Sequence, residues 1–177
     1  MGEGLDSFEK RRVEVSTQYL EHEPMISSSE SVATPSTSFW VVSVALLLWG
    51  LGGASIYVAY FVETPQEFAL TAETAANRQA YADYISNIPA WAITVGIIAA
   101  ATRLFGAIAL LSRRDWALPL YSISAVFFIA ALYRAFVLAN VASVMSASHI
   151  AVEFVFLTLS IFAVWFARDQ KTKGILR

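Results

Sequence analysis

The chain has 177 residues, of which 57% are hydrophobic and only 15% are charged, whereas a soluble domain usually carries about 25% charged residues. The formal net charge of -2 gives no electrostatic case for nucleic-acid binding, and the absence of cysteine excludes disulfides, thiolate metal sites and cysteine nucleophiles. Two histidines are too few for a multi-histidine metal site. The composition therefore predicts an integral membrane protein that needs no metal or other cofactor.

Residues 1–36 differ in composition from the rest of the chain. They hold seven acidic and three basic residues, and they end in a run rich in serine and threonine from Ser27 to Ser36. Such a segment buries too little apolar surface to fold by itself, so we expect a flexible polar tail. A signal peptide is not expected, because the first apolar run starts near residue 39 and is too long for one.

Four apolar segments are long enough to cross a bilayer, whose hydrocarbon core of about 30 Å needs roughly 20 helical residues. The predicted spans are residues 39–62, 89–111, 116–141 and 150–167. Pro119 fits the first turn of the third span, where its missing N–H costs little. We therefore expect an all-α bundle of four transmembrane helices over residues 37–167, followed by a soluble tail at 168–177.

The first span contains a patch of small residues formed by Gly50, Gly52, Gly53 and Ala54. Lipid provides no hydrophobic drive between helices, so helices associate where small residues let their backbones approach. The patch predicts a helix–helix contact, and a kink that lines a substrate path is the alternative.

The longest internal connection is residues 63–88. It begins with Thr64-Pro65-Gln66-Glu67, which has the N-cap, proline and acidic residue of a helix start. Isolated apolar side chains follow among polar ones, including Tyr81, Tyr84 and Ile85. This pattern predicts a short helix on the extracytoplasmic membrane surface. The alternative is a lid over a peptide or sugar site.

The basic residues predict how the chain is oriented. Four spans place both termini and the 112–115 turn on one side of the membrane. That side carries nine basic residues: Lys10, Arg11, Arg12, Arg113, Arg114, Arg168, Lys171, Lys173 and Arg177. The opposite side carries only Arg78. Because cytoplasmic loops are enriched in lysine and arginine, we expect a multi-pass protein with both termini in the cytoplasm.

Three ionisable residues lie within the predicted spans: Arg103, Arg134 and Glu153. Each costs about 2.5–3.5 kcal/mol at a helix centre and therefore needs a partner or water. At 1.5 Å per residue, Arg134 and Glu153 lie roughly 10 and 5 Å below the outer ends of antiparallel neighbouring helices. The pattern therefore predicts an ion pair between them.

Arg103 lies roughly 15 Å above Arg113, at a depth where no acidic residue is expected. Four hydroxyl residues lie near the same depth on the other spans: Ser43, Ser124, Thr158 and Ser160. We expect a polar layer in which Arg103 is hydrogen-bonded to hydroxyls, carbonyls or water. Its role stays open between a structural or lipid-bound cation, a ligand or anion site, and a contact with a partner subunit.

His149 lies at the outer mouth of the fourth span, one helical turn from Glu153. This spacing places both residues on one helix face, which suits a proton relay, although an interfacial histidine in a turn is the simpler interpretation. The spans contain no nucleophile–base arrangement, so we do not expect an enzyme.

Several of these segments resemble a family of small bacterial inner-membrane proteins that is loosely labelled "sugar transporter". The similarity lies in Trp49-Gly50, Tyr84, Pro89-Ala90-Trp91, the turn from Arg113 to Pro119, and Trp165-Phe166-Ala167-Arg168. It covers about 140 residues and excludes the N-terminal tail. The resemblance implies a bacterial cytoplasmic membrane, but it assigns no mechanism to particular residues.

The leading functional hypothesis is a non-catalytic accessory or scaffold subunit. Its partners would be membrane lipids and other integral membrane proteins, or a second copy of the chain, because four spans enclose little volume and small residues suit helix–helix contacts. The alternative is an oligomeric transporter or channel for a small, sugar-like solute.

Overall fold

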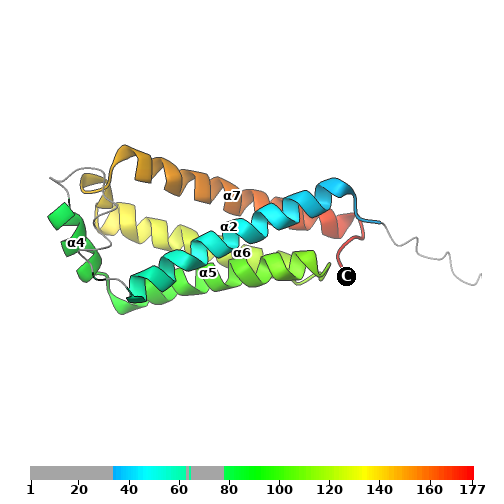
Figure 1. Cartoon of the computed structure of the whole chain (residues 1–177), viewed down its shortest axis with the longest axis horizontal. Helices are drawn as coiled ribbons and strands as arrows, with labels where there is room; N and C mark the ends of the chain where they lie inside the picture. Colours follow the sequence, from blue (N-terminus) through cyan, green and yellow to red (C-terminus); the bar gives the residue numbers. More distant parts are fainter. Residues whose placement is uncertain (1–33, 63, 65–77) are drawn as a thin grey trace, which may run out of the picture. The chain divides into compact units, whose positions relative to one another are not determined.

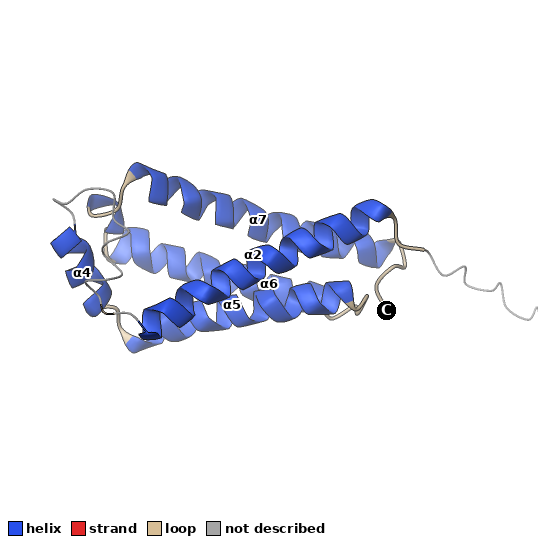
Figure 2. Ribbon diagram, in the orientation of Figure 1, coloured by secondary structure: helices blue, strands red, loops and turns tan. Residues whose placement is uncertain are grey.

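The structure is a computed structural model that describes residues 34–62, 64 and 78–177. In this part of the chain, helices are the only regular secondary structure (Figure 1, Figure 2). The four long helices are α2 (Thr37–Val62), α5 (Ala90–Leu111), α6 (Ala117–Tyr133) and α7 (Ala147–Thr172). Each forms a segment long and apolar enough to cross a membrane, the one that begins with α6 continuing to Leu138. The predicted all-α membrane bundle is confirmed.

The two ends of the bundle differ in what covers them. Helix α4 (Arg78–Ser86) lies across one end, and the chain's C-terminus lies at the other (Figure 1). The second end also carries residues 112–115, which hydrogen-bond to Arg177. We call these the α4 end and the basic end. The expected surface helix is thus present as α4, whereas residues 65–67 of the predicted helix start and residues 1–33 of the predicted tail lie outside the described residues.

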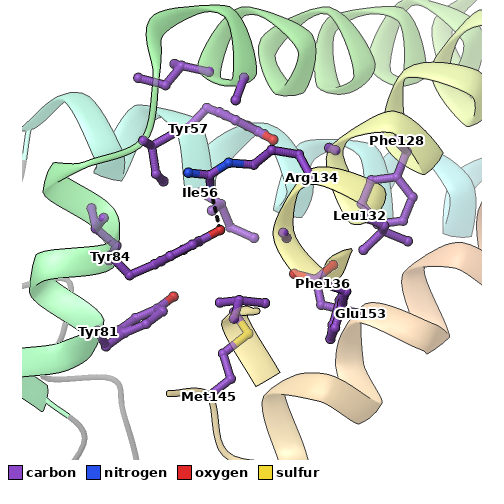
Figure 3. Close-up of a pocket in the computed structure, with 17 residues that line it drawn as sticks. Ile56, Tyr57, Tyr81, Tyr84, Phe128, Leu132, Arg134, Phe136, Met145 and Glu153 are labelled. Atoms are coloured by element: carbon purple, nitrogen blue, oxygen red, sulfur yellow. Dashed lines mark hydrogen bonds between the residues drawn. The ribbon is translucent and has the colours of Figure 1, made fainter. Parts of the chain in front are cut away.

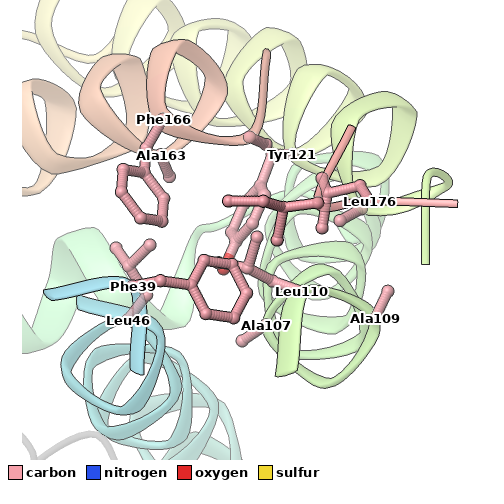
Figure 4. Packing of buried hydrophobic residues seen from close by; sticks show 12 residues of the cluster. Phe39, Leu46, Ala107, Ala109, Leu110, Tyr121, Ala163, Phe166 and Leu176 are labelled. Atoms are coloured by element: carbon pink, nitrogen blue, oxygen red, sulfur yellow. The ribbon is translucent and has the colours of Figure 1, made fainter. Parts of the chain in front are cut away.

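Small residues bring the helices together near the basic end. Helix α5 packs against both α2 and α6, and α6 packs against α7. Ala107, Ala117 and Ala163 are completely buried in a core that also contains Tyr121 and Phe166 (Figure 4). Without large side chains at these positions the backbones can approach closely, which is the usual source of helix association in lipid.

The small patch of the first span is used in two different ways. Gly50 packs on the backbone of Leu104 in α5, and Gly53 faces the guanidinium of Arg103, as a helix–helix contact requires. Gly52 instead is exposed, and no atom of another described element lies within 4 Å of the position that its Cβ would take.

The fourth helix is longer than the hydropathy pattern predicts, because it continues past residue 167 to Thr172. The chain then reverses at Gly174, whose φ of +68° favours glycine, and buries Ile175 and Leu176 in the core. The Arg177 N–H donates to the Arg113 carbonyl, and the Asp115 N–H donates to the Arg177 carbonyl, each at 2.9 Å. Residues 168–177 are therefore part of the folded bundle and do not form the expected soluble tail.

The third span also departs from the prediction of one helix to residue 141. After α6 the chain forms a π-helical turn, η2 (Arg134–Leu138), in which the Ala139 N–H donates to the Arg134 carbonyl at 3.0 Å. Asn140 then adopts a left-handed conformation, and a 3₁₀ turn, η3 (Val141–Ser143), follows. The extra residue in the π turn accompanies a buried Arg134, and π turns often occur at functional sites.

Candidate functional site

A cavity of about 210 Å³ lies at the α4 end of the bundle (Figure 3). Helices α2, α4, α5, α6 and α7 and the turns η2 and η3 all contribute to its wall. Most of the wall is apolar, with side chains such as Ile93, Phe136 and Met145. Its polar side chains are those of Tyr57, Tyr81, Tyr84, Arg134 and Glu153. The site thus combines an apolar body with a few polar groups, which is typical of small-molecule sites.

Arg134 is held by α4 and not by the fourth span. Its Nη1 donates to the Tyr84 hydroxyl at 2.6 Å, and its guanidinium carbon lies 4.9 Å from the centre of the same ring. Figure 3 shows the guanidinium directed toward Tyr84. No ion pair joins Arg134 and Glu153 in the described part of the chain, so that prediction is wrong. The guanidinium is instead turned toward α4, where it binds the Tyr84 hydroxyl and lies against its ring.

Tyr81 and Tyr84 lie one turn apart on α4, and their rings stack with centroids 6.1 Å apart. Burial raises the pKa of Tyr81 to about 12. Burial also raises the pKa of Tyr84, and the neighbouring Arg134 offsets part of this effect. Both hydroxyls therefore keep their protons at neutral pH and are available as hydrogen-bond donors.

Glu153 lines the cavity from α7, and the described residues provide it with neither a hydrogen-bond donor nor an ion-pair partner. It interacts electrostatically with Arg103 and His149. His149 itself is bound to Ser146, whose Oγ lies 2.8 Å from the imidazole Nδ1. Ser146 also caps α7 by accepting the His149 N–H at 3.4 Å. This arrangement holds the imidazole at the helix start. Within the described chain no hydrogen bond joins His149 to Glu153, so the two side chains do not form a direct proton relay.

Arg103 lies deeper in the bundle and is buried, with 4% of its surface exposed. Its guanidinium carbon lies 4.2 Å from the ring centre of Trp49, 5.0 Å from that of Phe128 and 5.9 Å from that of Phe156. Three aromatic faces therefore surround the cation, an attraction that is strongest where water is excluded. The Arg103 Nε has no hydrogen-bond partner in the described chain.

Ser43, Ser124 and Ser160 are buried as Arg103 is, but no hydrogen bond joins any of them to Arg103 in the described chain. The Ser43 Oγ is buried without a partner among the described residues. Ser124 donates to the Ala99 carbonyl at 2.8 Å, and Ser160 donates to the Phe156 carbonyl at 2.8 Å. Thr158 likewise bonds within its own helix. Serine and threonine in helices readily satisfy themselves on nearby carbonyls, which leaves the planar guanidinium to stack on rings.

The sequence did not predict that Tyr57, Tyr81 and Tyr84 would lie in one site with the charged side chains of the spans. Tyr57 also faces inward, because a methyl group at Gly96 of α5 would overlap its phenol. The available signal was the presence of Tyr81 and Tyr84 one turn apart in a polar connection. It pointed to the membrane surface, and nothing in the sequence placed either residue beside Arg134.

Comparisons with protein-family models, with curated proteins and with solved structures give no significant match for this chain. Within residues 34–62, 64 and 78–177, no group of three or more histidine, aspartate or glutamate side chains is placed to hold a metal ion. The described residues define a helical protein with four helices long and apolar enough to cross a membrane, and with a cavity that combines aromatic and charged side chains.

Proposed function

We propose that the protein is a non-catalytic accessory or scaffold subunit that packs against other integral membrane proteins or a second copy of itself. The observation that supports this is the outward face of α2. Ala45, Gly52 and Ala59 recur there every seven residues, with Val41 and Leu48 beside them. A Cβ built at Gly52 would meet no atom of another described element within 4 Å, and Leu48 is 64% exposed.

Small residues spaced seven apart form a helix face that can pack against a helix from another protein. Small side chains let two helix backbones approach, and in lipid this packing is the main source of association. Gly50 and Gly53, the other two glycines of the patch, already form contacts with α5 inside the bundle. A face built in the same way but left open supports a contact with a further helix.

The proposed orientation places the basic end in the cytoplasm. Arg113 and Arg114 lie at that end with the C-terminal residues, whereas Arg78 begins α4 at the opposite end. The asymmetry follows the positive-inside rule. The resemblance described above adds the bacterial cytoplasmic membrane as the proposed location.

Transport of a small, sugar-like solute is the second candidate, and the cavity at the α4 end favours it. Phe128 lines the cavity and also contacts Arg103, which lies deeper in the bundle, and the alanine-rich core fills the bundle near the basic end. A continuous polar path through one copy is therefore not available among the described residues. A transport path would have to form between copies, which makes this function depend on an oligomer.

A photo-crosslinking amino acid placed on the outward face tests the accessory role. The residue at Leu48 should give a discrete adduct with another membrane protein or with a second copy after irradiation of native membranes. The same residue at Val137, which is 62% exposed on η2 away from this face, is the control. Gly52→Ile should abolish the Leu48 adduct. Adducts with lipid alone, or equal adducts from both positions, would contradict the proposal.

A further inference from the structure

The cavity at the α4 end has a size that limits what it can hold. Its volume is about 210 Å³. An apolar cavity of about 150 Å³ accommodates one benzene molecule. The cavity therefore encloses about one six-membered ring with one or two small substituents, and because it is partly open a longer substituent can extend out of it.

The charges of the wall restrict the ligand further. Arg134 and Glu153 both face the cavity, so an anion is attracted by one and repelled by the other, and the same holds for a cation. Because removing an ion from water is costly, a ligand that gains from only one of two opposite charges is disfavoured. This arrangement disfavours a ligand with a single charge. The mostly apolar wall favours an uncharged ligand over a zwitterion, because removing two charges from water costs more than removing none.

The hydrogen-bonding groups of the wall require both a donor and an acceptor in the ligand. Arg134 uses one of its N–H groups on Tyr84, and the described residues provide no partner for the others. Glu153 accepts no hydrogen bond from the described chain. A guanidinium can only donate and a carboxylate can only accept. An oxygen that accepts from Arg134 and an O–H that donates to Glu153 would satisfy both.

We infer that this cavity binds one uncharged, hydroxyl-bearing aromatic ring, as in a phenol or a hydroquinone. The flat faces of the ring pack against the aromatic side chains of the wall, including Tyr84, Phe128 and Phe136. The ring oxygens meet Arg134, Glu153 and the tyrosine hydroxyls. This inference does not depend on the accessory role, because the outward face of α2 and the cavity use different residues.

A monosaccharide fits the same site less well. A hexose carries five hydroxyl groups and a ring oxygen, whereas the described residues of the wall offer five polar side chains, two of which already bind each other. Hydroxyls that enter without a partner lose their hydrogen bonds to water, and each such loss weakens binding. The predominantly apolar wall therefore selects a ring with few oxygens.

Ligand titration of the full chain in detergent micelles tests the inference, with heat of binding and thermal stabilisation as readouts. The probes are phenol, anisole, toluene and glucose. Anisole keeps the ring and the acceptor oxygen but has no O–H to give to Glu153. Phenol should bind at least about tenfold more tightly than anisole, because a hydrogen bond to a charged group supplies that much. Glucose should show no binding in the same range.

Variants separate the cavity from the detergent. Glu153→Gln should narrow the preference for phenol over anisole to about threefold or less, because the amide can donate as well as accept. Ala131→Leu fills the cavity and should abolish binding of both probes; if that variant does not fold, Ile93→Phe fills the same space from α5. Tyr133→Phe, whose side chain is exposed beside Arg134, should bind as the unchanged protein does.

Each opposite result overturns the inference: phenol that does not bind, equal affinity for phenol, anisole and toluene, binding that survives the filled cavity, or glucose that displaces phenol. A phenol with a long alkyl chain then identifies the source of the ring. Binding as tight as that of phenol, after correction for partition into micelles, assigns the site to a membrane-soluble ring. Loss of binding assigns it to a small water-soluble phenol.

Discussion

A methyl group added at Gly96 should destabilise the bundle, whereas the same methyl group at Gly52 should not. At Gly96 the ideal Cβ lies 2.7 Å from two ring carbons of Tyr57 and overlaps its hydroxyl oxygen, whereas carbon atoms ordinarily pack about 3.5–4.0 Å apart. At Gly52 the described residues of other elements place no atom within 4 Å of the ideal Cβ. Alanine is favoured over glycine in a helix by about 0.5–1 kcal/mol at either site, so this gain cancels when the two variants are compared. The remaining difference is the overpacking cost, about 1–3 kcal/mol.

Reversible unfolding of the purified variants in one detergent measures this difference. Gly96→Ala should be less stable than Gly52→Ala by about 1–3 kcal/mol. Adding Tyr57→Leu to Gly96→Ala should recover most of the loss, whereas Tyr57→Phe should recover little because the ring carbons remain. Equal stability of the two alanine variants would refute the packing of Tyr57 against α5. Strictly additive effects of Gly96→Ala and Tyr57→Leu would refute it as well.

Three further predictions concern other parts of the bundle. The free energy of unfolding should fall between pH 10 and about pH 12, because the folded chain holds the Tyr81 proton more tightly than the unfolded chain does. Tyr81→Phe should flatten this part of a plot of the free energy of unfolding against pH, and an unchanged slope would contradict the prediction. Leu176→Ala should cost about 2–5 kcal/mol in unfolding experiments, since Leu176 is buried, whereas Lys173→Ala should change little; equal effects would place the C-terminal residues outside the core. Trp49→Leu should lower the free energy of unfolding by about 1–3 kcal/mol, because contacts with the Phe156 ring and the Arg103 cation are lost. Trp165→Leu, at a 60% exposed site, should be near neutral in the same unfolding experiments.

The spans could be predicted from the sequence because their signal is local. An uninterrupted apolar run of about 20 residues has few alternatives to a membrane helix. The same reasoning placed the fourth helix end at residue 167, where hydropathy falls. The chain nevertheless continues as a helix to Thr172 and turns back at Gly174 to bury Leu176. Hydropathy cannot predict this ending, because it depends on contacts with a turn some sixty residues earlier.

The charged residues show the limit of arguments from depth. Depth along antiparallel helices identified Arg134 and Glu153 as residues of one region, and both do line the same cavity. The partner of Arg134 is nevertheless Tyr84, fifty residues away in a helix that does not span the membrane. For Arg103, Ser124 at the right depth donates to a carbonyl of α5 and Ser160 to a carbonyl of its own helix, and aromatic rings provide the contacts of the guanidinium. Sequence gives the height of a side chain, but the rotation of each helix decides its neighbours.

The contrast between the two ends of the bundle has a mechanical consequence. Completely buried alanines hold the helices together at the basic end, whereas a cavity lies between the helices at the α4 end. Tyr57 of α2 also packs against Gly96 of α5 beside the cavity. A widening of the cavity that keeps this contact would pivot about the basic end. A helix of 20 residues is about 30 Å long, so a tilt of about 5° about that pivot displaces its far end by roughly 3 Å. A rotation too small to disturb the alanine contacts is thus enough to admit or release a flat molecule at the opposite end.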